Sequence, residues 1–244
     1  MRTYLRKALL SAIGVGVAMP AFADEEGSVR NPAVDWDILW ADIISSITFI
    51  GVVFSIAAIW MLFKYRAKSE DEVGHAPKLS KAAALGWVLI PAALFMAEDF
   101  YLSAKGWVLW NDYRRIPDEA QEIRVTAYQW YWEFDYGDDI VSEELVLPQG
   151  KPVVLRMTSE DVLHSFYIPE YRVKEDVMPG RVTYVWFNPV NKGEHIYTCT
   201  EYCGTAHAEM AANIRIVDQE EYDAWFAQTK EEAKAASVQS NTQG

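Results

Sequence analysis

The most reactive side chains of the sequence gather in one short segment, residues 199–210, which reads CTEYCGTAHAEM. It holds both cysteines of the chain, Cys199 and Cys203, followed by His207 and Met210 at successive spacings of four, four and three residues. Thiolate, imidazole and thioether ligands together select copper, whereas zinc rarely takes methionine. The segment therefore predicts a copper site.

Two cysteines rather than one change the kind of copper site. A single blue-copper centre uses one cysteine, two histidines and a weak axial methionine. Two thiolates could instead bridge two copper ions, each of which would still need a histidine and a weak axial ligand. A disulfide between Cys199 and Cys203 is the alternative in an oxidising compartment, but it would leave the spacing of His207 and Met210 unexplained. We predict a dinuclear copper site.

The second histidine ligand must come from outside this segment. His195 precedes Cys199 by four residues on the incoming predicted strand, and His164 lies on an earlier one. We take His164 as the ligand and expect His195 to lie on the surface.

The part of the chain before the site has the pattern of an exported, membrane-anchored protein. Residues 1–23 have a basic start, an apolar stretch and a final AFA, as in a cleaved signal peptide. Residues 24–42 form a periplasmic segment, and residues 43–63 are an uncharged run of 21, close to the roughly 20 that a membrane-spanning helix needs. A second apolar stretch, 82–97, begins a second predicted transmembrane helix over 82–110.

The loop between the two spans, residues 64–81, holds five Lys and Arg against three Asp and Glu. An excess of Lys and Arg marks the cytoplasmic side, and a cleaved signal independently places residue 24 outside. We therefore expect a two-pass protein of the bacterial inner membrane with its N-terminus and its metal-site domain in the periplasm. His75, in the cytoplasmic loop, then lies on the wrong side of the membrane to be a ligand.

Residues 115–217 consist of short alternating runs separated by turn sequences, which favours an antiparallel sandwich or barrel. The predicted strands are Ile123–Tyr128, Tyr131–Tyr136, Leu145–Leu147, Val153–Met157, Val162–Ile168, Val182–Phe187, His195–Cys199 and Ala211–Val217. Residues 218–236 read as an acidic surface helix, and residues 237–244 as a polar, disordered tail.

The charge of the chain excludes some classes of partner. Its formal net charge is −13, and loss of residues 1–23, which carry three cations and no acid, would give −16. Such an acidic protein does not bind nucleic acid through phosphate contacts, but it suits a positively charged partner. The sequence also holds no CxxCH motif for covalent haem.

Several motifs, in order along nearly the whole chain, resemble subunit II of haem-copper cytochrome c oxidases, which carries a dinuclear copper (CuA) loop. They are the two N-terminal helices, QWYWEF at 129–134, DVLHS at 161–165, VKEDVMPGR at 173–181, and the copper loop itself. The resemblance implies two transmembrane helices followed by an all-β, cupredoxin-like Greek-key barrel.

The resemblance also implies roles for individual residues. The copper ligands it implies are His164, Cys199, the backbone carbonyl of Glu201, Cys203, His207 and Met210. The side chain of Glu201 would help hold a magnesium ion at the boundary with subunit I. Trp130 matches the aromatic residue through which electrons enter from cytochrome c.

The implied function is that of an oxidoreductase and translocase subunit. It accepts electrons from cytochrome c at CuA and passes them to the haem of subunit I, among other oxidase subunits, for oxygen reduction coupled to proton translocation. Acidic residues expected near the copper face would steer a basic cytochrome c; they are Asp135, Asp138, Asp139 and Asp161. The alternatives are the CuA subunit of a haem-copper nitric oxide reductase and, in a different class, a membrane-anchored copper-delivery or storage protein.

The sequence departs from the family pattern in three places. The start of the second helix, 78–85, lacks the glutamate that marks a proton-channel entrance in the typical oxidase, which puts proton uptake by that route in doubt. Ala127 stands where glycine is usual. Glu98 and Asp99 lie late in the second helix: either the helix ends near residue 97 and they are interfacial, or they face a partner membrane subunit.

Overall fold

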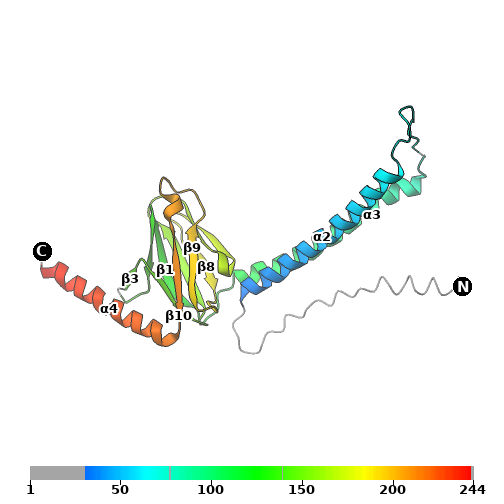
Figure 1. Ribbon diagram of the computed structural model, residues 1–244. Helices are drawn as coiled ribbons and strands as arrows, with labels where there is room; N and C mark the ends of the chain where they lie inside the picture. The colour runs from blue at the N-terminus through cyan, green and yellow to red at the C-terminus, as the bar shows by residue number, and fades with distance from the viewer. Residues whose placement is uncertain (1–30, 77, 139, 243–244) are drawn as a thin grey trace. The chain divides into compact units, whose positions relative to one another are not determined.

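The computed structural model describes residues 31–76, 78–138 and 140–242 (Figure 1). The predicted signal peptide, residues 1–23, lies outside the described residues.

Two long helices open the described chain, α2 (Pro32–Lys64) and α3 (Lys81–Tyr113), each of 33 residues. The Asn31 side chain caps α2 by accepting from the Ala33 N–H, and the Ser80 side chain caps α3 by accepting from the Ala83 N–H. The most apolar stretch of each helix is not buried inside the protein. A helix that is apolar all round and uncovered by protein needs lipid around it, so the two predicted membrane anchors are confirmed.

Both helices extend beyond the predicted spans. A helix of 33 residues is about 50 Å long at about 1.5 Å per residue, longer than the roughly 30 Å of hydrocarbon in a bilayer. In particular, α3 continues through Glu98 and Asp99, as the predicted span 82–110 requires, and this rules out the alternative in which the helix ends near residue 97. The same stretch of α3 contacts α2, because the Tyr101 hydroxyl donates a hydrogen bond to Asp42 at 2.7 Å.

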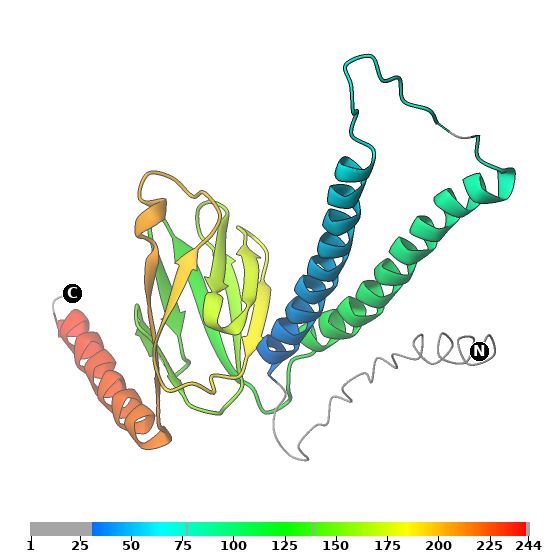
Figure 2. The same cartoon turned by 45° about the vertical axis from the view of Figure 1, so that its right-hand side comes forward.

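The described residues of the β domain form ten strands in two sheets (Figures 1 and 2). The strands are β1 (Gln121–Tyr128), β2 (Tyr131–Asp135), β3 (Val141–Ser142), β4 (Leu145–Pro148), β5 (Val153–Ser159), β6 (His164–Ile168), β7 (Val173–Val177), β8 (Thr183–Phe187), β9 (Gly193–Cys199) and β10 (Ala211–Val217). One sheet has the order β3-β2-β1-β5-β8 and the other β4-β10-β9-β6-β7. All eight predicted strands are present, while β3 and β7 were not predicted.

The sheets are mixed rather than purely antiparallel. β1 runs parallel to β5, with Val125 opposite Met157, and β10 runs parallel to β4, with Ile216 opposite Leu147. The expectation of an antiparallel sandwich is wrong for these two pairs, because the alternation of apolar residues reports which face is buried and carries no information on strand direction. Across the edge between the sheets, the Thr183 hydroxyl of β8 donates to the Asp176 carbonyl of β7 at 2.7 Å, which joins the edge strands as in a barrel.

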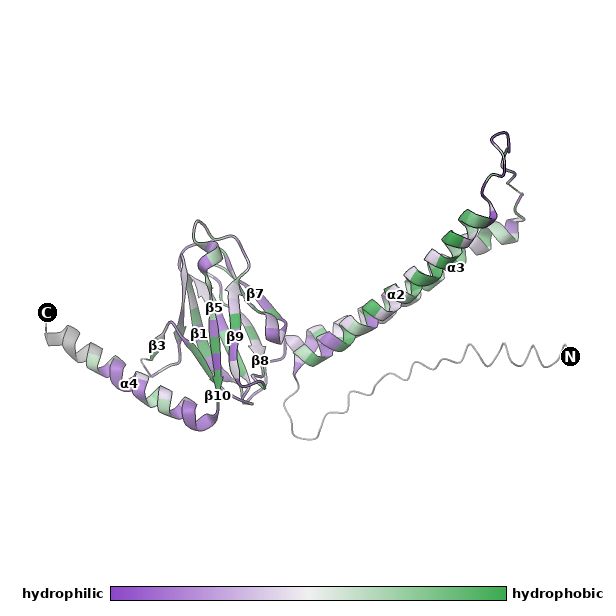
Figure 3. Cartoon of the chain, in the orientation of Figure 1, coloured by the Kyte–Doolittle hydropathy of each residue, from purple (hydrophilic) through white to green (hydrophobic). Residues whose placement is uncertain are grey.

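One continuous apolar core fills the space between the sheets. Its largest fully buried side chains include Phe134, Phe166, Phe187 and Tyr197. Figure 3 shows apolar residues along these strands and along both long helices. The same core cluster includes Phe166, Cys199, Cys203 and Met210, so the site is built on a rigid and dry support.

A 3-10 helix and a C-terminal helix lie outside the two sheets. The 3-10 helix η1 (Pro169–Tyr171) links β6 to β7, and helix α4 (Gln219–Thr242) follows β10. α4 packs through Trp225, whose ring lies 5.0 Å from that of Tyr136. The helix continues to Thr242, so most of residues 237–244, which we predicted to be a disordered tail, are helical.

Candidate metal centre

The cysteine segment is a loop between β9 and β10 whose two ends are held by backbone hydrogen bonds. Cys199, the last residue of β9, pairs with Phe166 of β6, and its N–H donates to the Met210 carbonyl at 3.0 Å. The Thr200 N–H donates to the Ser165 carbonyl at 2.9 Å. A short 3-10 helix, η2 (His207–Glu209), shapes the returning half of the loop. These bonds bring the loop against the strand that carries His164.

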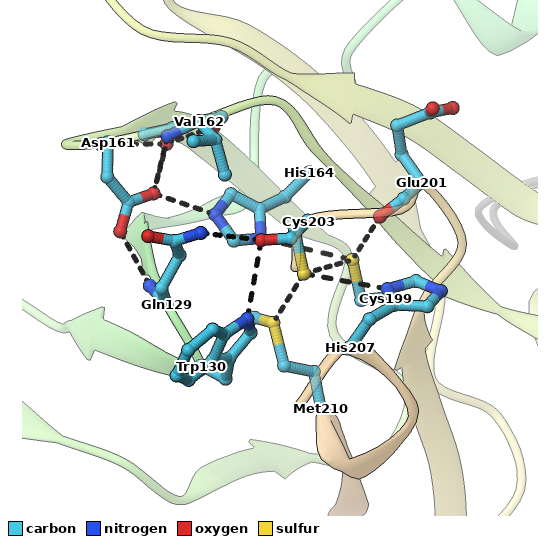
Figure 4. A network of polar contacts seen from close by, with 11 residues as sticks. Gln129, Trp130, Asp161, Val162, His164, Cys199, Glu201, Cys203, His207 and Met210 are labelled. Atoms are coloured by element: carbon cyan, nitrogen blue, oxygen red, sulfur yellow. Dashed lines mark hydrogen bonds and ion pairs between the residues drawn. The ribbon is translucent and has the colours of Figure 1, made fainter. Parts of the chain in front are cut away.

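The loop and strand together form a compact cluster of ligand atoms (Figure 4). The two Sγ atoms of Cys199 and Cys203 lie 3.9 Å apart. His164 Nδ1 is 3.9 Å from the Cys199 sulfur, and His207 Nδ1 is 3.5 Å from the Cys203 sulfur. Each thiol therefore has its own imidazole.

Two weaker ligand atoms complete the cluster, again one beside each thiol. The Met210 thioether lies 3.3 Å from the Cys203 sulfur, and the Glu201 backbone carbonyl lies 3.2 Å from the Cys199 sulfur. Cys199, Cys203, Met210 and His164 are buried, and His164 is 0% exposed. Such burial keeps water away from these four side chains, while His207 is half-buried.

This set of donors fits a copper site. Metal–thiolate bonds are about 2.3 Å long, so sulfurs 3.9 Å apart can share metal ions between them. The same separation is too long for a disulfide, whose S–S bond is about 2.05 Å, and both cysteines are free. Two soft thiolates, imidazoles and a thioether suit copper better than any harder metal.

The ionisation of the two thiols is strongly coupled. Burial opposes ionisation of Cys199, but hydrogen bonds from His164 and from backbone groups outweigh it and lower its pKa. Burial, together with the charge of Cys199, raises the pKa of Cys203. The Cys199 thiol therefore ionises readily. The Cys203 thiol ionises only when a bound cation offsets the added negative charge.

Asp161 orients the buried histidine. Its carboxylate lies 2.9 Å from His164 Nε2, on the opposite edge of the ring from the sulfur-facing Nδ1. Burial lowers the pKa of His164, but hydrogen bonds to Cys199 and Asp161 overcome this effect and raise it. Desolvation likewise opposes ionisation of Asp161, while bonds from His164 and from the Val162 and Gln129 N–H groups hold its pKa below the ordinary value.

The β1–β2 turn approaches the loop from the other side. Gln129 Nε2 donates to the Cys203 carbonyl at 2.6 Å, and the Trp130 indole N–H donates to the same carbonyl at 3.3 Å. Gly204 permits this contact, since a Cβ at that position would lie 3.0 Å from both donor nitrogens. Trp130 nevertheless remains 38% exposed, so it links the loop to the protein surface.

The structure brings together every residue that the sequence analysis assigned to the site and separates the rejected histidines from it. His195 Nε2 instead contacts the Asn191 carbonyl at 2.8 Å, and His75 lies exposed in the loop between α2 and α3. Sequence reasoning missed the positioning roles of Gln129, Gly204 and Asp161. Gln129 and Asp161 stand in the quoted motifs, but their partners lie on other segments of the chain.

The acidic residues expected near the copper face are distributed differently. Asp135 ends β2 and Asp138 follows it, so both lie about 16 Å or more along the chain from Trp130. There they pair with Arg124 at 2.9 Å and Lys230 at 2.6 Å. Among the described carboxylates of this group, only Asp161 lies at the site, and Asp139 lies outside the described residues. The expectation is therefore wrong for Asp135 and Asp138.

Comparisons with known proteins agree with this architecture. The family model described as "Cytochrome C oxidase subunit II, periplasmic domain" matches residues 139–217. An alternative cytochrome c oxidase subunit 2 of Bradyrhizobium diazoefficiens is 30% identical over 233 residues, covering 81% of this chain and 82% of its own length. A cytochrome c oxidase subunit 2 of Cereibacter sphaeroides is 27% identical over 238 residues, covering 79% and 76% respectively.

A solved structure is also similar. The periplasmic domain of subunit II of cytochrome oxidase from Bradyrhizobium japonicum is 31% identical, with a TM-score of 0.46, and the match covers 48% of this chain and 99% of that one.

Fold and site define a class of protein: a β domain that carries a buried copper site of cysteine, histidine and methionine and is anchored by two membrane helices. Within that class, the chain belongs to the cytochrome c oxidase subunit II family. It is a subunit of an oxidoreductase complex and associates with other oxidase subunits. This confirms the main function expected from the sequence, and the comparisons give no support to a nitric oxide reductase subunit or a copper-delivery protein.

Proposed function

We propose that the cluster is a dinuclear CuA centre held by His164, Cys199, Cys203, His207, Met210 and the Glu201 carbonyl. The observation that carries this proposal is the paired arrangement of donors around two sulfurs 3.9 Å apart. One imidazole and one weak donor lie beside each thiol. A single metal ion would leave half of this set without a role.

Bound copper would supply one-electron redox chemistry with little change in geometry. The chain's own residues hold the donor atoms in place, exclude water from them and set the strength of the axial contacts. Asp161 holds the His164 ring, and Gln129 holds the Cys203 backbone. Because these contacts fix the side chains that would hold copper, the ligands need little rearrangement when electrons pass.

We propose cytochrome c as the electron donor, with Trp130 as the residue through which electrons enter. The exposed indole reaches the Cys203 carbonyl directly. The rings of Tyr128 and Tyr131, at the two ends of the β1–β2 turn, stack with their centroids 4.7 Å apart, which stabilises the turn. The neighbouring Tyr131 is exposed as well, and exposed aromatic side chains of this kind are common in contacts with protein partners.

We further propose that electrons continue to the haem of subunit I, where oxygen is reduced with coupled proton translocation. The backbone carbonyl of Glu201 points to the sulfurs while its carboxylate points away from them (Figure 4). The carboxylate is therefore available for the proposed magnesium ion, since hard cations prefer oxygen ligands.

We place the protein in the bacterial inner membrane with the β domain in the periplasm. The five Lys and Arg of residues 64–81 support a cytoplasmic loop. Val73 is exposed in that loop, so a V73C variant tests the orientation when it is labelled with a membrane-impermeant maleimide. Cys199 and Cys203 are replaced by serine in this variant, because both are free thiols in the β domain. Labelling only after the membrane is opened supports the proposal, and labelling of intact spheroplasts contradicts it.

Electron paramagnetic resonance of the copper-loaded full chain tests the dinuclear centre. We expect two coppers per chain and a delocalised seven-line spectrum, which C203S should convert to the spectrum of a localised copper. One copper per chain, or a four-line spectrum from the unaltered protein, contradicts the proposal.

The role of Trp130 is tested in the assembled oxidase by W130F, with Y131F as the matched control on the neighbouring exposed ring. We expect W130F to slow cytochrome c oxidation while the copper spectrum stays the same, and Y131F to have a much smaller effect. Equal rates for W130F and the unaltered oxidase overturn the assignment.

A further inference from the structure

A cavity lies away from the metal centre, where α2 meets the β6–η1 corner of the β domain. It has a volume of about 520 Å³ and is lined by Trp36, Asp37, Trp40, Tyr167 and Arg172. We call it the α2 pocket. Its size falls within the range of small-molecule sites, roughly 300–1,000 Å³.

The α2 pocket lies at the level of lipid headgroups. Its α2 residues immediately precede the uncharged run that begins at residue 43. At about 1.5 Å per residue, the centre of the segment 36–40 stands about 7 Å outside the hydrocarbon, within the headgroup layer of a bilayer. Trp36 and Trp40 are typical of this zone, where an indole has one apolar and one hydrated side.

The polar groups of the α2 pocket carry both signs of charge. Arg172 Nε lies 3.0 Å from an oxygen of Asp37, and Arg172 Nη1 donates to the Pro169 carbonyl at 2.8 Å. The two charged side chains remain 49% and 56% exposed. Such an exposed pair is worth little by itself, so both groups are accessible to a ligand that offers a phosphate and an ammonium together.

The aromatic residues favour the same kind of ligand. A cation is attracted to the face of an indole, and the side chain of Trp40 is 63% exposed. A guanidinium binds phosphate oxygens through parallel hydrogen bonds. An anionic lipid would lack a partner for Asp37 and would approach a chain of net charge −13.

We propose that the α2 pocket binds the headgroup of a zwitterionic phospholipid with a primary ammonium, of the phosphatidylethanolamine type. Arg172 binds the phosphate, Asp37 accepts hydrogen bonds from the ammonium, and Trp36 and Trp40 flank it. Since the pocket joins α2 to the β domain, a bound lipid also fixes that corner of the domain at the membrane surface.

Native mass spectrometry of the full chain, released from micelles with defined lipids, tests this. We expect phosphatidylethanolamine to be retained in preference to phosphatidylcholine, which has no N–H to donate, and to phosphatidylglycerol, which has no cation. R172Q and D37N should each lower retention about tenfold, as for loss of one charge-assisted contact. R115Q is the matched control, because Arg115 is an exposed arginine that does not line the α2 pocket, and it should not lower lipid retention.

Circular dichroism separates loss of binding from loss of fold, since D37N removes only one charge from an exposed helix position. Equal retention of the three lipids, preference for phosphatidylglycerol, or retention unaffected by both R172Q and D37N in folded protein overturns the proposal.

Discussion

The carboxylate of Asp161 lies 2.9 Å from Nε2 of His164, so the buried imidazole is held from the edge opposite its sulfur contact. The same carboxylate accepts a hydrogen bond from the Gln129 N–H at 2.6 Å. One exposed acid thereby connects a metal-facing histidine to the turn that carries Trp130. Groups that orient a ligand in this way commonly affect metal binding nearly as much as the ligand itself.

The first prediction concerns this bond. D161N should weaken copper binding by about 10- to 100-fold, because the amide cannot hold the imidazole as a carboxylate does. A competition titration of the full chain with a copper chelator measures the effect. D135N, which breaks only the Arg124 pair at the far end of β2, is the control. Equal copper affinities for D161N and D135N would show that the Asp161 contact is incidental.

The second prediction concerns the close approach at Gly204. G204A should displace Trp130 and Gln129, because the added Cβ would lie 3.0 Å from their side-chain nitrogens. Gly204 has a φ of +127° and Gly137 a φ of +83°, but nothing lies within 4 Å of a Cβ at Gly137. Both alanine variants should lose about 1–3 kcal/mol of stability from the backbone conformation.

Only G204A should in addition slow electron transfer from cytochrome c, measured in the assembled oxidase with the copper content checked. If G137A slows it as much, the effect comes from general destabilisation rather than from the Trp130 contact.

The third prediction separates the chemical role of Met210 from its role in packing. M210L preserves volume and should cost less than about 1.5 kcal/mol of unfolding free energy, while the copper reduction potential shifts because the axial thioether is lost. M157L, at a fully buried methionine of β5, should cost a similar amount and leave the potential unchanged. Unfolding of the β domain in M210L alone would assign Met210 a structural role instead.

The fourth prediction concerns pH and the attachment of α4. Asp218 accepts a hydrogen bond from Lys192 at 2.6 Å and from the Glu221 N–H at 3.0 Å, and these bonds, the Lys192 contact first, lower its pKa. A folded-state pKa below the unfolded value stabilises the protein above the ordinary aspartate pKa of about 3.9. The contribution is lost as the pH falls through the folded-state value.

D218N should therefore melt at a lower temperature than the unaltered chain at pH 6, and the difference should disappear near pH 3. Thermal denaturation followed by circular dichroism measures both. A difference of the same size at both pH values would mean that the charge of Asp218 contributes nothing.

Several features could be predicted because they depend on neighbours in the sequence. The donors Cys199, Cys203, His207 and Met210 occupy one segment, and the two apolar runs are continuous. β7 (Val173–Val177) escaped prediction because its two buried valines enclose three polar residues, which read as a loop. The acids Asp135 and Asp138 were misplaced because a strand carries residues only a few positions from Trp130 to the opposite end of the domain.

The sequence by itself determined the types and spacing of the copper donors, the two membrane helices and most of the strands, since local spacing and hydrophobic periodicity are sufficient for these. Only the tertiary structure decided that Asp161 holds His164 from the edge opposite the sulfurs, and that Gln129 reaches a carbonyl 74 residues away. Contacts of this kind depend on strand direction and register, and on where a missing side chain, as at Gly204, leaves room for another segment.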